Sequence, residues 1–319
     1  MPSSVSSSLP RSSALSVSIL RGRQNRAVSG PFGVSIPDRF GRSSHIRSAL
    51  GRRVIASRPR KFVGAAPSPV GERQGYTAET PQSVAGVKLL VFDWDGTVVD
   101  SIAHITDSWT KAFEDWVAAR QEERLQEGLS PCFVPSEEEV KKCIGLSVDA
   151  TVLYHIRDAT ETDVDVVREA YRKYFRAGAD DTQFFPGAQE SLQRLQDEGF
   201  HMAVATGKSS RGLNREFGLL RGSRWFTVTR TADCTQSKPH PQMLMEIMEE
   251  FDVLPDNTVM IGDSVVDMAM AQRAGVRSIA VAYGAEPREA LEAEQPLFCA
   301  DDWPSLLAFI LQNLSLSSS

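Results

Sequence analysis

Two aspartates separated by one residue carry most of the chemical information in this chain. Asp93 and Asp95 stand in the segment Asp93-Trp-Asp95-Gly-Thr97, directly after the four apolar residues 89–92. An apolar run of this kind is typical of a buried strand. Two carboxylates where such a strand ends can hold a divalent cation, or divide the roles of nucleophile and acid–base catalyst.

The same residues resemble a calcium-binding turn, but the spacing decides against an EF-hand. That loop requires a glutamate at its twelfth position. Counting from Asp93, the twelfth residue is His104. We therefore interpret the two aspartates as a catalytic pair.

A hydroxyl and an ammonium group stand near the ends of later segments. Thr206 and Gly207 close the apolar run 200–207, so a hydroxyl is followed by an open backbone amide. Lys238 precedes the segment 243–251, in which apolar residues recur at helical spacing. Taken alone, Thr206 also fits a strand-end cap and Lys238 a solvated surface charge.

A second acidic pair, Asp263 and Asp267, follows the apolar run 258–261. If a helix begins near Ser264, the two side chains lie about one turn apart and face the same way. Asp263 alone also fits a helix N-cap. The order of the segments favours a functional interpretation, because each lies at or just beyond the end of a successive predicted strand.

Together the four segments resemble the signature motifs of the haloacid dehalogenase superfamily, in its phosphoglycolate-phosphatase-like branch. The matching motifs are Asp93-Trp-Asp95-Gly-Thr97, Thr206-Gly207-Lys208, Ser237-Lys238-Pro239 and Gly262-Asp263-Ser264-x-x-Asp267. The resemblance extends over about residues 86–312. Four motifs in this order are specific for the superfamily and much less specific for a substrate.

The resemblance implies phosphoryl transfer, and the residue types suit it. A phosphate monoester is a dianion, so a carboxylate attacks it only when cations neutralise the charge. Asp93 would be the nucleophile, Asp95 the general acid and base, and Lys238 the balancing cation. The implied cofactor is Mg²⁺, a hard ion suited to oxygen ligands. Its implied site comprises Asp93, the backbone carbonyl of Asp95, Asp263, and Asp267, which would steady Lys238 or a water on the metal. The implied phosphate-binding residues are Thr206, Gly207 and Lys208.

Asp95 also separates reaction classes within the resembled superfamily. Members that cleave carbon–halogen bonds lack this second acid, since halide leaves without a proton, so dehalogenation is not expected. Phosphonate cleavage would need a Schiff-base lysine, and the lysines of the region between the first two motifs stand in no diagnostic context: Lys111, Lys141, Lys142 and Lys173. We expect a phosphatase for a small phosphomonoester, such as phosphoglycolate or a sugar phosphate. A phosphomutase and a catalytically inactive partner-binding protein are the alternatives.

The long region between the first two motifs predicts a second domain. It exceeds the crossover that a βαβ unit needs, and its apolar residues recur at helical spacing over 105–116 and 164–175. We expect an all-helical cap over 101–183, which would exclude water and contact the leaving group. By position in the resembled caps, Gly145, Leu146 and Ser147 would bind substrate, although Gly145 also fits a helix end.

The remaining apolar segments alternate with helical ones, which is typical of an α/β fold with a doubly wound parallel sheet. The expected strands and helices are a strand from about Val87, strands over 225–229, 276–282 and 297–299, and helices over 187–198 and 240–251. Residues 86–100 and 184–312 would form this core domain, and residues 313–319 a flexible tail.

The N-terminal region differs in composition from the rest of the chain. Residues 1–70 hold twelve basic residues, sixteen serines and one acid, Asp38, which leaves 23 basic and 40 acidic residues for positions 71–319. A serine- and arginine-rich, acid-poor N-terminus is typical of an organellar transit peptide. We expect residues 1–85 to be a disordered transit peptide and linker that contacts the organellar import machinery. The abundance of serine favours a chloroplast over a mitochondrion.

Other partner classes are disfavoured by the same sequence. The acidic balance of the chain after residue 70 argues against a nucleic-acid-binding arm, and the apolar stretch 17–20 is far too short to span a membrane. The four cysteines show neither metal-ligand nor redox spacing, which indicates free thiols in a reducing compartment.

Overall fold

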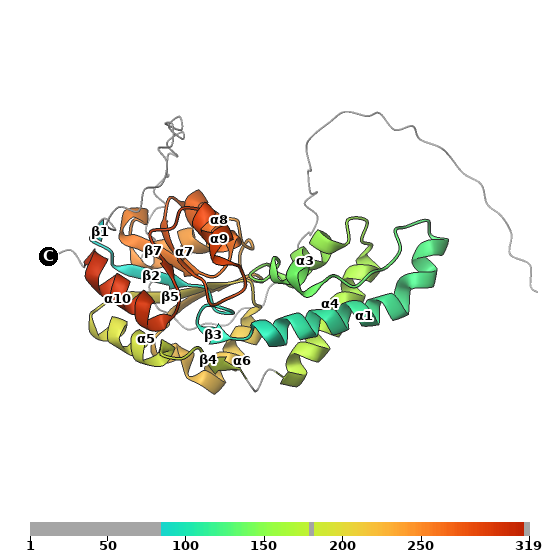
Figure 1. The fold of residues 1–319 in the computed structure, drawn as a ribbon, viewed down its shortest axis with the longest axis horizontal. Helices are drawn as coiled ribbons and strands as arrows, with labels where there is room; N and C mark the ends of the chain where they lie inside the picture. Colours follow the sequence, from blue (N-terminus) through green and yellow to red (C-terminus); the bar gives the residue numbers. More distant parts are fainter. Residues whose placement is uncertain (1–83, 179–181, 316–319) are drawn as a thin grey trace, which may run out of the picture. The chain divides into compact units, whose positions relative to one another are not determined.

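The computed structural model describes residues 84–178 and 182–315 (Figure 1). The predicted transit peptide and nearly all of the predicted linker lie outside the described residues, so those two predictions are untested. Within the described residues all four cysteines are unpaired. No helix there is long and apolar enough to cross a membrane.

A six-stranded parallel sheet forms the centre of the described structure. Its strand order is β6-β5-β2-β7-β8-β9. The strands are β2 (Leu89–Phe92), β5 (His201–Thr206), β6 (Val228–Thr231), β7 (Thr258–Gly262), β8 (Arg277–Val281) and β9 (Cys299–Ala300). Every neighbouring pair runs parallel, which confirms the predicted doubly wound sheet.

Helices cover both faces of this sheet (Figure 1). They are α5 (Ala188–Asp197), α6 (Ser210–Leu220), α7 (Gln242–Phe251), α8 (Val265–Ala274), α9 (Arg288–Ala293) and α10 (Trp303–Asn313). Leu90 and Phe92 of β2 pack in one buried cluster with side chains of α5, α6 and α10. Leu89 and Val91 pack in another cluster with α7 and α8. Because both faces of β2 are buried, its sequence is continuously apolar.

Residues 102–178 form a separate group of helices. They are α1 (Ile102–Gln126), α2 (Glu137–Lys141), α3 (Val148–His155) and α4 (Glu161–Gly178). Two short antiparallel strands, β3 (Val99–Asp100) and β4 (Gln183–Phe184), stand at the two ends of this insert. Trp109, Phe113 and Val167 belong to an apolar cluster formed almost wholly by these helices, which we call the cap.

Several predicted boundaries are wrong, for identifiable reasons. Trp225 and Phe226 are buried, but they follow the 3-10 turn η2 (Gly222–Arg224) and precede β6, so an apolar run was mistaken for a strand. The last strand of the sheet is 299–300 rather than 297–299. The predicted tail begins too early, because α10 reaches Asn313 and the strand β10 (Leu314–Ser315) pairs with β1 (Val84–Ala85).

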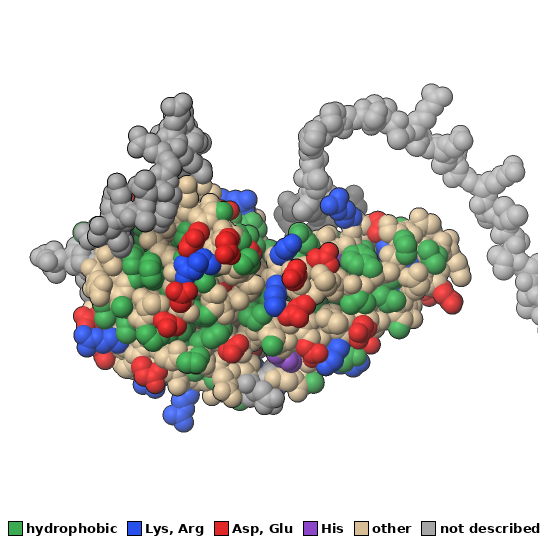
Figure 2. Space-filling view, in the orientation of Figure 1, with side chains coloured by type: hydrophobic (Ala, Val, Ile, Leu, Met, Phe, Trp, Pro, Cys, Tyr) green, Lys and Arg blue, Asp and Glu red, His purple; other side chains and the backbone are tan. Residues whose placement is uncertain are grey.

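On the face shown in Figure 2, acidic and basic side chains of the described residues are interspersed with apolar ones. A surface of this kind is ordinary for a folded domain, since apolar atoms always contribute much of the exposed area. The features that need a chemical explanation are instead the buried charges, many of which lie at one edge of the sheet.

Candidate active site

The motif residues meet at the carboxyl edge of the sheet. Asp93 follows β2, Thr206 ends β5 and Asp263 follows β7. β2 lies between β5 and β7, and the three strands are parallel, so their carboxyl ends lie side by side. Lys238 reaches the same edge from the segment between β6 and α7.

Asp93 is held on one oxygen only. Its Oδ1 accepts hydrogen bonds from the Trp94 amide at 2.7 Å and from the Lys238 ammonium at 2.8 Å. Its Oδ2 is buried and has no partner among the residues that the structure describes. Burial raises the pKa of Asp93 to about 7, although Lys238 acts in the opposite direction. An unpaired buried carboxylate oxygen is costly, which indicates a place for a ligand.

Lys238 joins Asp93 to Asp267. Its ammonium lies 2.6 Å from Oδ1 of Asp267, whose Oδ2 accepts a hydrogen bond from Ser264 at 2.6 Å. Burial alone would lower the pKa of Lys238, but Asp267 and Asp93 outweigh that effect and raise it. Ser264 also caps α8, so this helix begins where the sequence predicts it. The contacts make Asp267 a support for Lys238.

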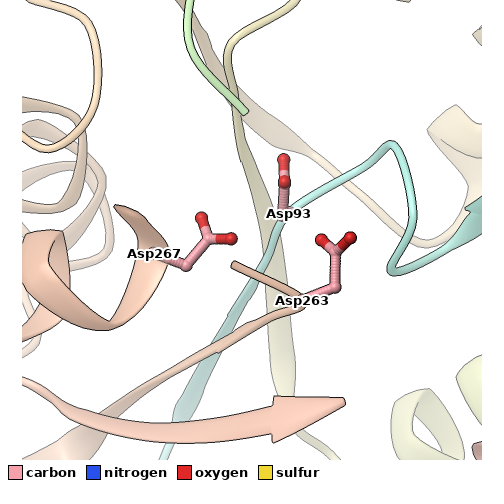
Figure 3. A group of neighbouring side chains, drawn as sticks. All are labelled: Asp93, Asp263 and Asp267. Carbon is pink, nitrogen blue, oxygen red and sulfur yellow. The ribbon is translucent and has the colours of Figure 1, made fainter. Parts of the chain in front are cut away.

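The carboxylate of Asp263 lies beside that of Asp93, at the end of β7 (Figure 3). Its Oδ1 accepts from the Thr97 hydroxyl at 3.0 Å and its Oδ2 from the Ala285 amide at 2.8 Å. Burial, followed by the charges of Asp93 and Asp267, raises the pKa of Asp263 well above its ordinary value. Gly96 permits this arrangement, because its φ is +77° and a Cβ there would lie 2.1 Å from Oδ2 of Asp263.

These three aspartates fit a divalent cation. Carboxylate oxygens of Asp93, Asp263 and Asp267 lie within 4.8 Å of one another and all three side chains are buried (Figure 3). Lys238 balances only part of their charge, and Oδ2 of Asp93 still lacks a partner. A cluster of hard oxygen donors with excess negative charge suits Mg²⁺. Asp95 is predicted to reach the metal through its backbone carbonyl, and its side chain contacts Ser101 and Lys208 instead.

Asp95 lies beside a second lysine. Its Oδ1 accepts a hydrogen bond from Ser101 at 2.7 Å and lies 3.2 Å from the ammonium of Lys208. The side chain of Lys208 is buried, and its ammonium also contacts Oε1 of Glu216 on α6 at 2.8 Å. The predicted phosphate-binding lysine is therefore paired with two acids of the core.

Glu216, Trp94 and Ser101 are site residues that the sequence interpretation missed. Trp94 donates from its indole nitrogen to Oε2 of Glu216 at 2.6 Å. Burial raises the pKa of Glu216, while Lys208 opposes the shift. None of the three belongs to a position with a predicted role, and only the helical pattern of α6 hints at Glu216.

Two glycines, Gly207 in the second motif and Gly145 in the cap, allow the cap backbone to lie close to the core. Gly207 follows Thr206, and a Cβ at Gly207 would lie 2.2 Å from the carbonyl oxygen of Gly145. A Cβ at Gly145 would in turn lie 3.9 Å from Oδ2 of Asp93. Gly145 and Leu146 line the cavity described next, whereas Ser147 is not among its lining residues and its hydroxyl caps α3.

A cavity of about 540 Å³ lies over Asp93, Asp95 and Thr206. Such a volume lies within the range of about 300–1,000 Å³ that is usual for small-molecule sites. Its apolar wall comes from the cap: Ile105, Trp109, Ile144, Leu146, Val148, Tyr171 and Phe175. Four arginines also line it, Arg172 and Arg176 from α4 and Arg211 and Arg215 from α6. Arginines at a site mouth favour an anionic ligand.

Comparison with known proteins agrees with this arrangement. A phosphoglycolate phosphatase from Vibrio parahaemolyticus is 28% identical over 233 residues, which cover 70% of this chain and 96% of that protein. The pyrophosphatase PpaX from Bacillus mycoides is 25% identical over 70% of this chain and 97% of its own length. A solved hydrolase from Pseudomonas syringae shares the fold, with a TM-score of 0.61 at 20% identity over 72% of this chain and all of its own.

A family model gives the decisive match. Residues 90–281 match that of the haloacid dehalogenase-like hydrolases. The match spans more than half of the chain and includes the motif residues that meet at the sheet edge. This chain belongs to the haloacid dehalogenase-like hydrolase family.

Proposed function

We propose that this protein is a magnesium-dependent phosphatase that hydrolyses a small phosphomonoester through an aspartyl-phosphate at Asp93. The observation that carries the proposal is the environment of that carboxylate. Lys238 and the Trp94 amide hold Oδ1, and Oδ2 is left without a partner among the described residues in a side chain that lines the cavity. A nucleophile needs one such oxygen, with the carboxylate held in a fixed orientation.

The residues that would hold Mg²⁺ are Asp93, Asp263 and the backbone carbonyl of Asp95. Asp267 would keep Lys238 in place, because its Oδ1 lies 2.6 Å from that ammonium. Bound Mg²⁺ would neutralise charge on the phosphoryl oxygens and so lower the barrier to attack by an anion.

The proposed reaction has two steps. Oδ2 of Asp93 attacks phosphorus, the bond to the leaving oxygen breaks, and Asp95 gives that oxygen its proton. Asp95 then removes a proton from water, which attacks phosphorus and releases phosphate and free Asp93. Throughout, the Thr206 hydroxyl and the Gly207 amide bind phosphoryl oxygens, and Lys238 balances the negative charge.

The substrate class is supported by the cavity and by the relatives. Its arginines suit a phosphorylated metabolite, and its apolar cap wall suits an organic leaving group. The relatives named above are a phosphoglycolate phosphatase and a pyrophosphatase. Phosphoglycolate is therefore the first natural ester to test, within a wider panel of sugar and nucleotide phosphates.

The decisive experiment measures hydrolysis of an aryl phosphate by the full chain with and without Mg²⁺. Wild type should turn over only with the metal, and Asp93→Asn should lose at least about 10³-fold in kcat. Asp107→Asn, which removes an exposed ion-paired carboxylate, is the matched control and should retain wild-type kinetics. Circular dichroism would show that both variants fold.

Three outcomes would contradict the proposal in different ways. Wild-type turnover by Asp93→Asn would remove the assigned nucleophile. Isomerised product that depends on a bisphosphate activator would indicate a phosphomutase. No turnover of any ester in the panel, together with a stable protein complex, would indicate a protein that binds partners without catalysis.

A further inference from the structure

A buried polar network links Asp95 to the core. It consists of Trp94, Glu216, Lys208 and Asp95. We infer, given the phosphatase function proposed above, that Glu216 is a positioning residue that holds Lys208 and thereby orients Asp95 toward the leaving group of the substrate.

Lys208 is fixed from three directions. Its ammonium lies 2.8 Å from Oε1 of Glu216, 3.2 Å from Oδ1 of Asp95 and 4.4 Å from the centre of the Phe175 ring in the cap. Its side chain is only 7% exposed. A buried ammonium needs partners, because desolvation without them is costly. Glu216 supplies the shortest of these contacts.

Glu216 is itself fixed. Its side chain is 1% exposed, and its second oxygen accepts the indole N–H of Trp94 at 2.6 Å. That indole packs against Phe217 and Phe226, with ring centres 5.0 and 6.0 Å away. Both oxygens of Glu216 therefore have different donors, and the carboxylate cannot turn without losing one. Trp94 also lies between Asp93 and Asp95 in the chain, so the residue that holds Glu216 is adjacent to both aspartates.

The network holds one carboxylate oxygen of Asp95 and leaves the other without a donor. Ser101 and Lys208 both contact Oδ1, and Oδ2 has no donor among the described residues. A proton on Asp95 must therefore sit on Oδ2, the edge that can reach a leaving oxygen. Without Glu216 the long, flexible side chain of Lys208 would lose its firmest contact, and Asp95 would lose the cation that orients it.

A purely structural role for Glu216 predicts something different from a positioning role. A loosened fold would slow every substrate alike. A misplaced Asp95 would slow only esters whose leaving group needs a proton. Alkyl phosphates release a strongly basic alkoxide and depend on general acid catalysis, whereas p-nitrophenyl phosphate releases a stable phenolate and does not.

The experiment compares kcat/KM for glycerol 2-phosphate and p-nitrophenyl phosphate, using the full chain with Mg²⁺. This parameter reports steps up to release of the leaving group, so later hydrolysis of the intermediate does not obscure it. Glu216→Gln leaves one acceptor oxygen for two donors, so Trp94 or Lys208 loses its partner. We expect it to lower kcat/KM by about 10²-fold for the alkyl ester and by less than about threefold for the aryl ester.

Two further variants keep the test sharp. Trp94→Phe removes the indole donor and part of the buried ring. It should give a smaller loss that again falls mainly on the alkyl ester, and it serves if Glu216→Gln does not fold. Glu246→Gln alters a partly buried helical glutamate that pairs with Arg230 outside the cavity. It should leave kcat/KM for both esters unchanged. Equal losses on both esters, or no loss on either, would overturn the inference. Failure of wild type on both esters would instead refute the phosphatase function.

Discussion

At the scale of single residues, Gly207 and Gly145 determine how closely the cap loop, residues 142–147 between α2 and α3, approaches the core. A Cβ at Gly207 would lie 2.2 Å from the carbonyl oxygen of Gly145 and 2.6 Å from that of Leu146. These are backbone atoms, so rotation of a side chain cannot relieve the contact. We expect Gly207→Ala to displace the cap loop and to lower kcat/KM for a phosphomonoester by about 10²-fold, as measured by steady-state kinetics.

Gly218→Ala is the matched control for that substitution. Gly218 lies in α6, and no atom would lie within 4 Å of a Cβ there. This change should leave the kinetics unaltered and stabilise the protein by up to about 1 kcal/mol through helix propensity. Wild-type kcat/KM in Gly207→Ala would show that catalysis does not need the close approach.

Residues with motif spacing could be located from the sequence, and residues that support them could not. Asp93, Thr206 and Asp263 each follow or end an apolar run, and parallel strands bring such ends together. Glu216 has no such mark, because a lone helical glutamate is usually solvated. Only a weak indication in the sequence pointed to burial of Glu216. Leu213 lies three residues before it and Phe217 one residue after it, and both belong to the buried face of α6.

At the scale of elements, a buried ion-pair cluster joins α1 to α4 within the cap. Asp163 accepts hydrogen bonds from Trp116 at 2.9 Å, Arg120 at 3.1 Å and Arg124 at 2.5 Å. Asp163→Asn would leave two buried guanidinium groups short of their counter-charge. We expect a loss of about 3 kcal/mol in the free energy of unfolding, measured by urea denaturation at neutral pH.

The control for that prediction and its pH dependence follow from the same contacts. Asp165→Asn removes an exposed partner of Arg168 and should cost no more than about 1 kcal/mol. Burial alone would raise the pKa of Asp163, but hydrogen bonds from Thr160 and Trp116 outweigh it and hold the pKa well below its ordinary value. The difference in the free energy of unfolding between Asp163→Asn and wild type should therefore be largest at neutral pH and shrink as pH falls below about 4. A difference independent of pH would contradict this origin.

Elements could be predicted where periodicity and burial agree. The apolar runs before Asp93 and Asp263 are strands, as their sequence predicts, and α8 begins just after Ser264, where the spacing of Asp263 and Asp267 favours a helix. Prediction failed where burial occurs without regular structure. Trp225 and Phe226 fill the core from a turn, and hydrophobicity does not distinguish that from a strand.

At the scale of the whole molecule, the fold class and the family were both predictable, and both are confirmed. Four motifs separated by long segments constrain the order of strands and the place of the insert, so they carry information about the whole chain. Supports that depend on tertiary packing, such as the contact between Lys208 and Phe175, have no counterpart in local sequence. They arise only when cap and core meet.

The buried acids should also make the stability of the whole protein depend on Mg²⁺. Lys238 pairs with two of the three clustered carboxylates and balances only part of their charge. A cation bound only by the folded state adds about 2.7 kcal/mol at a hundred times its Kd. We expect Mg²⁺ to raise the Tm by about 5–10 °C at constant ionic strength, and EDTA to reverse the rise. Asp263→Asn can keep both contacts of Asp263, since its carbonyl accepts from Ala285 and Thr97 can accept from its amide. Because the pKa of Asp263 is raised, losing its charge should increase the Tm without metal and abolish the response to Mg²⁺. An equal response in wild type and variant would place the metal elsewhere, and no response in wild type would contradict metal binding by the folded protein.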